Sequence, residues 1–141
     1  MFRRSLVLAG CVVMFAGAAS AATVKFNAPL TAGAEVPPGK SAGSGQATAM
    51  LDTATHELTY DVSFKGFASD VTAAHIHGPA EVGKNAGVVL PLGNSPKDPI
   101  HGTVKLTPEQ EQQLQAGMYY VNVHTKNNAG GAVRGQLMVT K

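Results

Sequence analysis

Residues 57–64 read Glu-Leu-Thr-Tyr-Asp-Val-Ser-Phe and alternate strictly between polar and apolar side chains. Successive side chains of an extended strand point to opposite faces, so the apolar members of this run share one face and the polar members the other. The pattern predicts a half-buried β-strand. Residues 46–51 precede it across the five-residue connection Asp52-Thr53-Ala54-Thr55-His56, which suits a β-hairpin with a longer loop.

Segments of the same kind recur along the rest of the chain. The other predicted strands are residues 24–29, 72–77, 88–92, 102–106, 118–125 and 132–139. Turn-forming runs separate them, namely Pro37-Pro38-Gly39, Gly78-Pro79, Gly93-Asn94-Ser95-Pro96 and Gly130-Gly131. About eight short strands in a domain of this size predict an all-β fold, a Greek-key-like antiparallel β-sandwich.

One short helix interrupts the predicted strands. Thr107 is a suitable N-cap, Pro108 suits the first helical position, and Gly117 suits the residue that ends the helix. Acidic side chains at positions 109 and 111 favour the positive end of the helix dipole. We expect about two turns of helix, attached to the end of the sandwich by Leu114.

The first residues have the form of a cleavable export signal. Arg3 and Arg4 give a basic start, and the apolar run over residues 6–19 carries no charge. The run is shorter than the roughly 20 residues that a membrane span needs, and it ends in Ala-Ser-Ala at positions 19–21, which signal peptidase accepts. We therefore expect a signal peptide over residues 1–21 and one mature domain over residues 22–141, located in the periplasm or secreted.

A lipoprotein is the alternative form of export. Leu-Ala-Gly-Cys at positions 8–11 resembles a lipobox, in which Cys11 would carry the lipid anchor. Against this, the stretch between Arg4 and Cys11 is short for the apolar part of a signal, and the apolar run continues well past the cysteine.

The charge balance of the mature domain excludes two kinds of partner. Once Arg3 and Arg4 leave with the signal, 9 basic residues face 9 acidic ones, so the mature domain has no formal net charge. That balance speaks against nucleic acid or an anionic membrane surface as a partner.

Cys11 is the single cysteine, so the mature domain has no disulfide and must be stabilised by its core.

Two histidines stand on one predicted strand, in the run Ala74-His75-Ile76-His77. Side chains two residues apart on a strand share a face at roughly 7 Å, so two imidazoles can converge on one ion while Ile76 points to the core. A second predicted strand carries His124, which shares its face with Tyr120 and Asn122. If the two strands are neighbours, three imidazoles meet; otherwise the histidines form a structural polar cluster.

The sequence supports a functional role less strongly for the remaining histidines and for Arg134 than for His75, His77 and His124. His101 precedes a strand and is a possible fourth ligand, and His56 lies in the hairpin loop. For both residues, and more so for His56, the sequence favours an exposed loop histidine over a ligand. Imidazole ligands without thiolates favour copper(II) or zinc over calcium or magnesium. Arg134 is expected to pair with Asp61, with Asp70, or with the carboxylate of a ligand.

Several of these motifs together resemble the CHRD (chordin) domain family. They are residues 30–38 with Gly-Ala-Glu-Val-Pro-Pro, residues 74–79, Leu-Thr at 106–107 before the helix, residues 120–125, Gly-Gly at 130–131, and Arg-Gly-Gln-Leu at 134–137. The resemblance covers nearly the whole mature chain and implies a β-sandwich binding module of the bacterial, exported, single-domain type. It does not carry over the growth-factor partner of animal chordins, and the physiological ligand, whether a protein or a small molecule, stays open.

A weaker resemblance is to copper/zinc superoxide dismutase. The order His75, His77, His124 matches its copper-binding histidines, but the enzyme's disulfide and zinc-ligand loop have no counterpart here. Motifs for a nucleophile elbow, a zinc protease or a phosphate-binding loop are also missing. Three hypotheses follow: a non-catalytic exported binding module with a copper or zinc site, a copper-dependent redox protein, and a structural or adhesion domain without metal. The sequence leaves the oligomeric state open.

Overall fold

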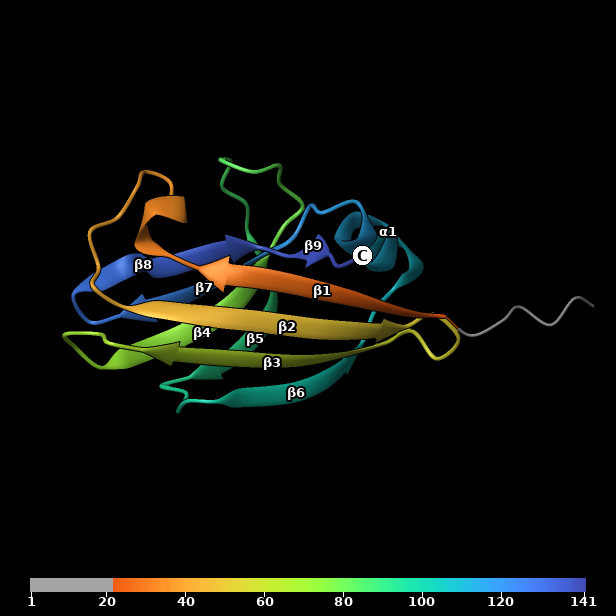
Figure 1. Ribbon diagram of the computed structural model, residues 1–141, viewed down its shortest axis with the longest axis horizontal. Helices are drawn as coiled ribbons and strands as arrows, with labels where there is room; N and C mark the ends of the chain where they lie inside the picture. Colours follow the sequence, from red (N-terminus) through yellow and green to blue (C-terminus); the bar gives the residue numbers. More distant parts are fainter. Residues whose placement is uncertain (1–21) are drawn as a thin grey trace, which may run out of the picture.

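The computed structural model describes residues 22–141; the predicted signal peptide and the lipobox alternative at Cys11 therefore lie outside the described residues. Across residues 22–141, nine strands form two antiparallel sheets (Figure 1). The five-stranded sheet has the order β6 (Ile100–Lys105), β3 (Glu57–Lys65), β2 (Ser44–Asp52), β1 (Thr23–Leu30), β9 (Met138–Val139). The four-stranded sheet has the order β5 (Val88–Asn94), β4 (Val71–His77), β7 (Tyr120–Thr125), β8 (Asn128–Gln136).

The predicted all-β sandwich is confirmed, with local differences in strand number and length. The chain crosses between the sheets after β3, β5, β6 and β8. The strand predicted over residues 132–139 is divided into β8 and the short β9, which pairs with β1 in the other sheet. The Gly130-Gly131 pair, predicted to bound a strand, lies inside β8.

Strand β3 shows how alternation builds the core. Leu58 and Val62 are 0% and 1% exposed, and both belong to the hydrophobic cluster between the sheets. Thr59 and Ser63, on the other face, are exposed. The predicted hairpin with β2 is confirmed, and His56 in its turn takes the left-handed conformation, with φ of 64°.

Helix α1 (Pro108–Gln115) is also confirmed. The Thr107 side chain accepts a hydrogen bond from the backbone N–H of Gln110, whose own side chain accepts one from the N–H of Thr107. This reciprocal capping box satisfies two backbone donors at the start of the helix. Leu114 is 0% exposed, so the helix packs against the sandwich through that side chain. Among the described residues, no helix is long and apolar enough to cross a membrane.

Two connecting segments cover the outer face of the four-stranded sheet. One follows β1 and contains the 3₁₀ turn η1 (Ala32–Ala34); the other is the 78–87 connection between β4 and β5. In Figure 1 these segments, orange and green, rise on the same side of the molecule. They are joined directly, because the Asn85 side-chain amide donates to the Val36 carbonyl at 3.0 Å. The cover makes polar side chains of this face part of the interior.

Candidate metal centre

Adjacent strands β4 and β7 bring three histidines together. Ile76 and its neighbours in the core are buried, which turns His75 and His77 of β4 to the outer face. The antiparallel register pairs His75 with Asn122 and Ala73 with His124, so His124 of β7 reaches the same face. The sequence made the meeting of the three imidazoles depend on whether the two strands are neighbours, and the pairing of β4 with β7 fulfils that condition.

The three rings are close enough to share one ion. One ring nitrogen from each of His75, His77 and His124 lies within 4.8 Å of the other two. The shortest contact is 3.1 Å, between Nδ1 of His75 and Nε2 of His124. Zinc–nitrogen bonds of about 2.0–2.1 Å at a tetrahedral angle place ligand nitrogens about 3.3 Å apart. The closest pair already has this spacing, whereas nitrogens as far apart as 4.8 Å would have to approach one another by up to about 1.5 Å to hold a metal ion.

Backbone carbonyls orient two of the three rings. Nδ1 of His77 lies 3.0 Å from the Ala86 carbonyl oxygen, and Nδ1 of His124 lies 2.9 Å from that of Ala129. A carbonyl oxygen only accepts, so each Nδ1 carries the proton, and Nε2 of both rings keeps its lone pair. A carbonyl on the second nitrogen is the usual support of a metal-bound imidazole.

Nε2 of His77 is buried and has no hydrogen-bond partner among the described residues. Buried polar atoms normally have partners, and leaving one unpaired costs about 1–3 kcal/mol. The same atom is the lone-pair nitrogen of this ring. A metal ion would supply the missing interaction.

Burial also keeps two of the rings in their neutral, ligating form. Desolvation lowers the pKa of His75, with the nearby His124 and His77 acting in the same direction. The pKa of His77 is likewise lowered, chiefly by desolvation, against the raising effect of its hydrogen bond to Ala86. Metal ligands must be unprotonated, so this environment favours coordination at neutral pH.

The other two histidines lie elsewhere. His101 is on β6 in the five-stranded sheet, where its Nδ1 contacts the carboxylate of Asp61. His56 contacts Glu111 of α1, with 2.6 Å between Nδ1 and Oε1. The structure thus places the possible fourth ligand, His101, on the opposite sheet and away from the three-histidine group.

The predicted pairing of Arg134 with Asp61 or Asp70 was wrong. Arg134 lies on β8 and is 2% exposed, whereas Asp61 contacts His101 and Asp70 pairs with Lys126 at 2.7 Å. Its guanidinium instead donates to the Asn85 side-chain oxygen at 2.9 Å and to the Lys84 carbonyl at 2.6 Å. The 78–87 connection that covers Arg134 comes from a distant part of the chain.

Glu35 is a buried site residue that residue patterns missed. It is 8% exposed, and its carboxylate accepts a hydrogen bond of 2.6 Å from the Asn122 side chain. Burial raises its pKa to about 7, while Arg134 and the Asn122 hydrogen bond act in the opposite direction. The one available signal is a lone carboxylate within Gly-Ala-Glu-Val-Pro-Pro, a run otherwise made of small and apolar residues.

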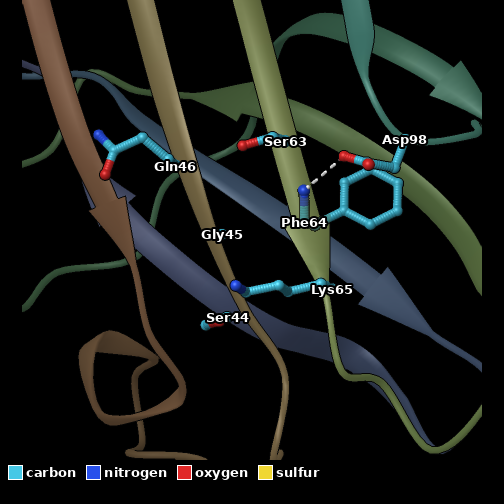
Figure 2. A pocket seen from close by; sticks show the side chains of 7 residues that line it. All are labelled: Ser44, Gly45, Gln46, Ser63, Phe64, Lys65 and Asp98. Atoms are coloured by element: carbon cyan, nitrogen blue, oxygen red, sulfur yellow. Dashed lines mark hydrogen bonds between the residues drawn. The ribbon is translucent and has the colours of Figure 1, made fainter.

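A separate hollow lies on the five-stranded sheet (Figure 2). It has a volume of about 280 Å³ and is lined by Ser44, Gly45, Gln46, Ser63, Phe64, Lys65 and Asp98. Its one carboxylate, Asp98, already accepts a hydrogen bond from the backbone N–H of Phe64 at 2.8 Å. Lys65 and Asp98 are both exposed, so the hollow lacks the buried, convergent polar groups of the histidine cluster.

Comparison with known protein families gives a match over most of the chain. The family described as the CHRD domain matches residues 26–137, which spans the sandwich from β1 to the residue after β8. Neither the search of curated proteins nor that of solved structures finds a match.

Proposed function

The chain belongs to the CHRD domain family, and we propose that it is a binding module that holds one copper or zinc ion on His75, His77 and His124. The observation that carries the proposal is the convergence of three imidazole nitrogens within 4.8 Å. The carbonyl supports of His77 and His124 and the unpaired Nε2 of His77 add to it. Nitrogen ligands without thiolate favour copper(II) or zinc among common metals.

Metal binding through Nδ1 of His75 requires one rearrangement of protons at the site. Nε2 of His124 has a lone pair, so the 3.1 Å contact with His75 is a hydrogen bond only when Nδ1 of His75 carries the proton. If His75 ligates through this nitrogen, its proton moves to Nε2, which gives the other neutral tautomer. No net proton release is needed from neutral His75.

The proposal is tested by calorimetric titration of residues 22–141 with zinc and with copper(II). Saturable binding of one ion per chain is expected, and the double substitution His75→Ala/His77→Ala should weaken it by at least about 100-fold, since removal of one supporting group alone costs about 10–100-fold. His101→Ala is the matched control and should bind as the unsubstituted protein does. Equal binding by all three proteins would place the metal ion at another site, and no binding by any of them would leave a structural or adhesion domain without metal.

A copper-dependent redox activity is the second candidate. Three protein ligands leave a coordination position open, which is typical of catalytic rather than structural metal sites. The three histidines are each partly exposed, so a small oxidant such as superoxide can reach the ion. Superoxide turnover by the copper-loaded protein, lost in the His75→Ala/His77→Ala variant, would support this activity; copper binding without turnover would leave the binding module.

We also propose, from the sequence alone, that residues 1–21 are an export signal that is cleaved off. A protein made with residues 1–21 is expected to be recovered outside the cytoplasm with Ala22 as its first residue. Intact-mass measurement tests this, because a lipid-modified Cys11 at the N-terminus would identify a lipoprotein instead.

A further inference from the structure

A cavity of about 390 Å³ opens beside Arg134, under the two segments that cover the four-stranded sheet. It is lined by Gly33, Ala34, Glu35, Val36, Pro38, Val82, Gly83, Arg134 and Gln136. The volume lies within the range of about 300–1,000 Å³ that small-molecule pockets occupy. Its walls are largely apolar, and Val82, which is 73% exposed, stands on the covering segment as an apolar side chain without cover of its own.

Arg134 is the one cationic side chain among the lining residues, and it is a buried charge that forms no ion pair with another described residue. Arg134 is 2% exposed. Its acidic neighbour on the cavity wall is Glu35, which interacts with it electrostatically, yet within residues 22–141 no carboxylate oxygen forms an ion pair with it. Its hydrogen bonds to Asn85 and Lys84 use two of its five N–H donors. The face of Tyr120, 3.4 Å from the guanidinium carbon, gives partial compensation. Buried charges are normally paired, so this arrangement is one that an incoming anion completes.

The other polar groups of the cavity are compatible with an anion. Gln136 is occupied, because its amide donates to the carbonyls of Ala80 at 2.9 Å and Gly117 at 2.7 Å. Glu35 would repel an anion when ionised, but burial raises its pKa to about 7, so it takes up a proton readily near neutral pH. The groups that face Glu35 are Arg134 of β8 and Asn122 of β7, of which only Arg134 is charged.

We propose that this cavity binds a small organic carboxylate, with the anionic group on Arg134 and an apolar body along Val36, Pro38 and Val82. The ligand has one negative charge and one apolar segment, because Arg134 is the one cation that lines the cavity among the described residues and the walls are otherwise largely apolar. The site is separate from the three histidines and does not depend on a metal ion. The two covering segments would hold the bound molecule between them, since the Asn85–Val36 hydrogen bond joins them at this place.

Hexanoate is a suitable probe, with hexanamide as its uncharged counterpart. In a titration followed by backbone amide NMR, hexanoate should give saturable shifts at Gly33 and Gly83 with a dissociation constant of about 1–10 mM, corresponding to a few kcal/mol for so small a ligand. Hexanamide should bind at least about 10-fold more weakly, because it cannot use the charge of Arg134. Equal affinities of the acid and the amide, or no saturable shift with hexanoate, would overturn the proposal.

Substitution of Arg134 risks the fold, so the decisive variant is Val82→Asp on the exposed wall. The added carboxylate should weaken hexanoate binding at least about 10-fold by repulsion and loss of apolar contact. Val88→Asp is the matched control, because Val88 is also exposed but lies on β5, at the opposite edge of the sheet from β8. If Val82→Asp binds hexanoate as well as Val88→Asp does, the carboxylate does not occupy this cavity.

Discussion

The imidazole of His77 stacks on the ring of Tyr120, with ring centroids 4.9 Å apart and ring planes only 1° from parallel. The Tyr120 hydroxyl contacts both the N–H and the carbonyl of Ala86, the residue whose carbonyl also orients His77. The same ring lies 3.4 Å from the guanidinium carbon of Arg134. Tyr120 therefore connects the proposed metal ligand with the arginine of the cavity, and it acts as a positioning residue for His77.

Removal of the Tyr120 ring is predicted to weaken metal binding without removal of a ligand. Tyr120→Leu loses the stacking surface and the contacts with Ala86, and zinc affinity should fall by about 10-fold or more, as for other groups that orient ligands. Tyr120→Phe keeps the ring and loses only the hydroxyl contacts with Ala86, so its zinc affinity should stay within about 5-fold of the unsubstituted protein, which corresponds to about 1 kcal/mol. Calorimetric zinc titration distinguishes them; unchanged affinity in Tyr120→Leu would refute the positioning role.

Glu35 predicts a pH dependence of stability. The carboxyl has an ordinary pKa of 4.5 and a folded-state pKa of about 7, so the folded protein binds a proton more tightly than the unfolded chain. The protonated carboxyl contributes its full stabilisation below pH 4.5. This contribution is lost as the pH rises from 4.5 to about 7, and the free energy of unfolding does not change further through Glu35 at higher pH.

Comparison with Glu35→Gln isolates this contribution from the titration of the histidines. The neutral amide has a similar shape and cannot ionise, so the variant should gain stability relative to the unsubstituted protein as the pH rises from about 5 to about 8. Urea unfolding at both pH values measures the difference between the two proteins. A constant difference would mean that Glu35 titrates at the same pH in the folded and unfolded states.

Gly131 is predicted to be essential because the absence of a side chain leaves space for the Glu35 carboxylate. A Cβ at this position would lie 2.6 Å from both carboxylate oxygens and from the Asn122 amide nitrogen, and the residue has φ of 138°. Gly131→Ala should therefore cost about 2 kcal/mol or more in the free energy of unfolding. The neighbouring Gly130 has no atom within 4 Å of such a Cβ, so Gly130→Ala is the matched control. Similar unfolding midpoints for the two variants would contradict this packing.

Local pattern predicted most of the fold because alternation and turn residues depend on near neighbours in sequence. The face of each β3 residue, the Thr107 cap and the common face of His75 and His77 all follow from the periods of strand and helix. His124 approaches His75 and His77 only because β7 pairs with β4. The sequence alone did not predict this pairing.

The cover over the outer sheet face could not be predicted in this way. Glu35 and Asn122 are 87 positions apart, and Asn85 and Val36 are 49 apart, so no local period relates them. From its outward-facing position on a strand, Arg134 would be expected to lie at the surface. It is buried because the 78–87 connection covers it. The same long-range contacts explain why Gly131 serves packing inside β8 rather than a turn.

The most direct test of the metal centre is a crystal structure of the zinc-loaded protein with anomalous diffraction at the zinc edge. One peak is expected within about 2.0–2.1 Å of Nε2 of His77, Nε2 of His124 and a ring nitrogen of His75. No peak between these three rings, or a peak at His101 and Asp61 alone, would contradict the proposed site.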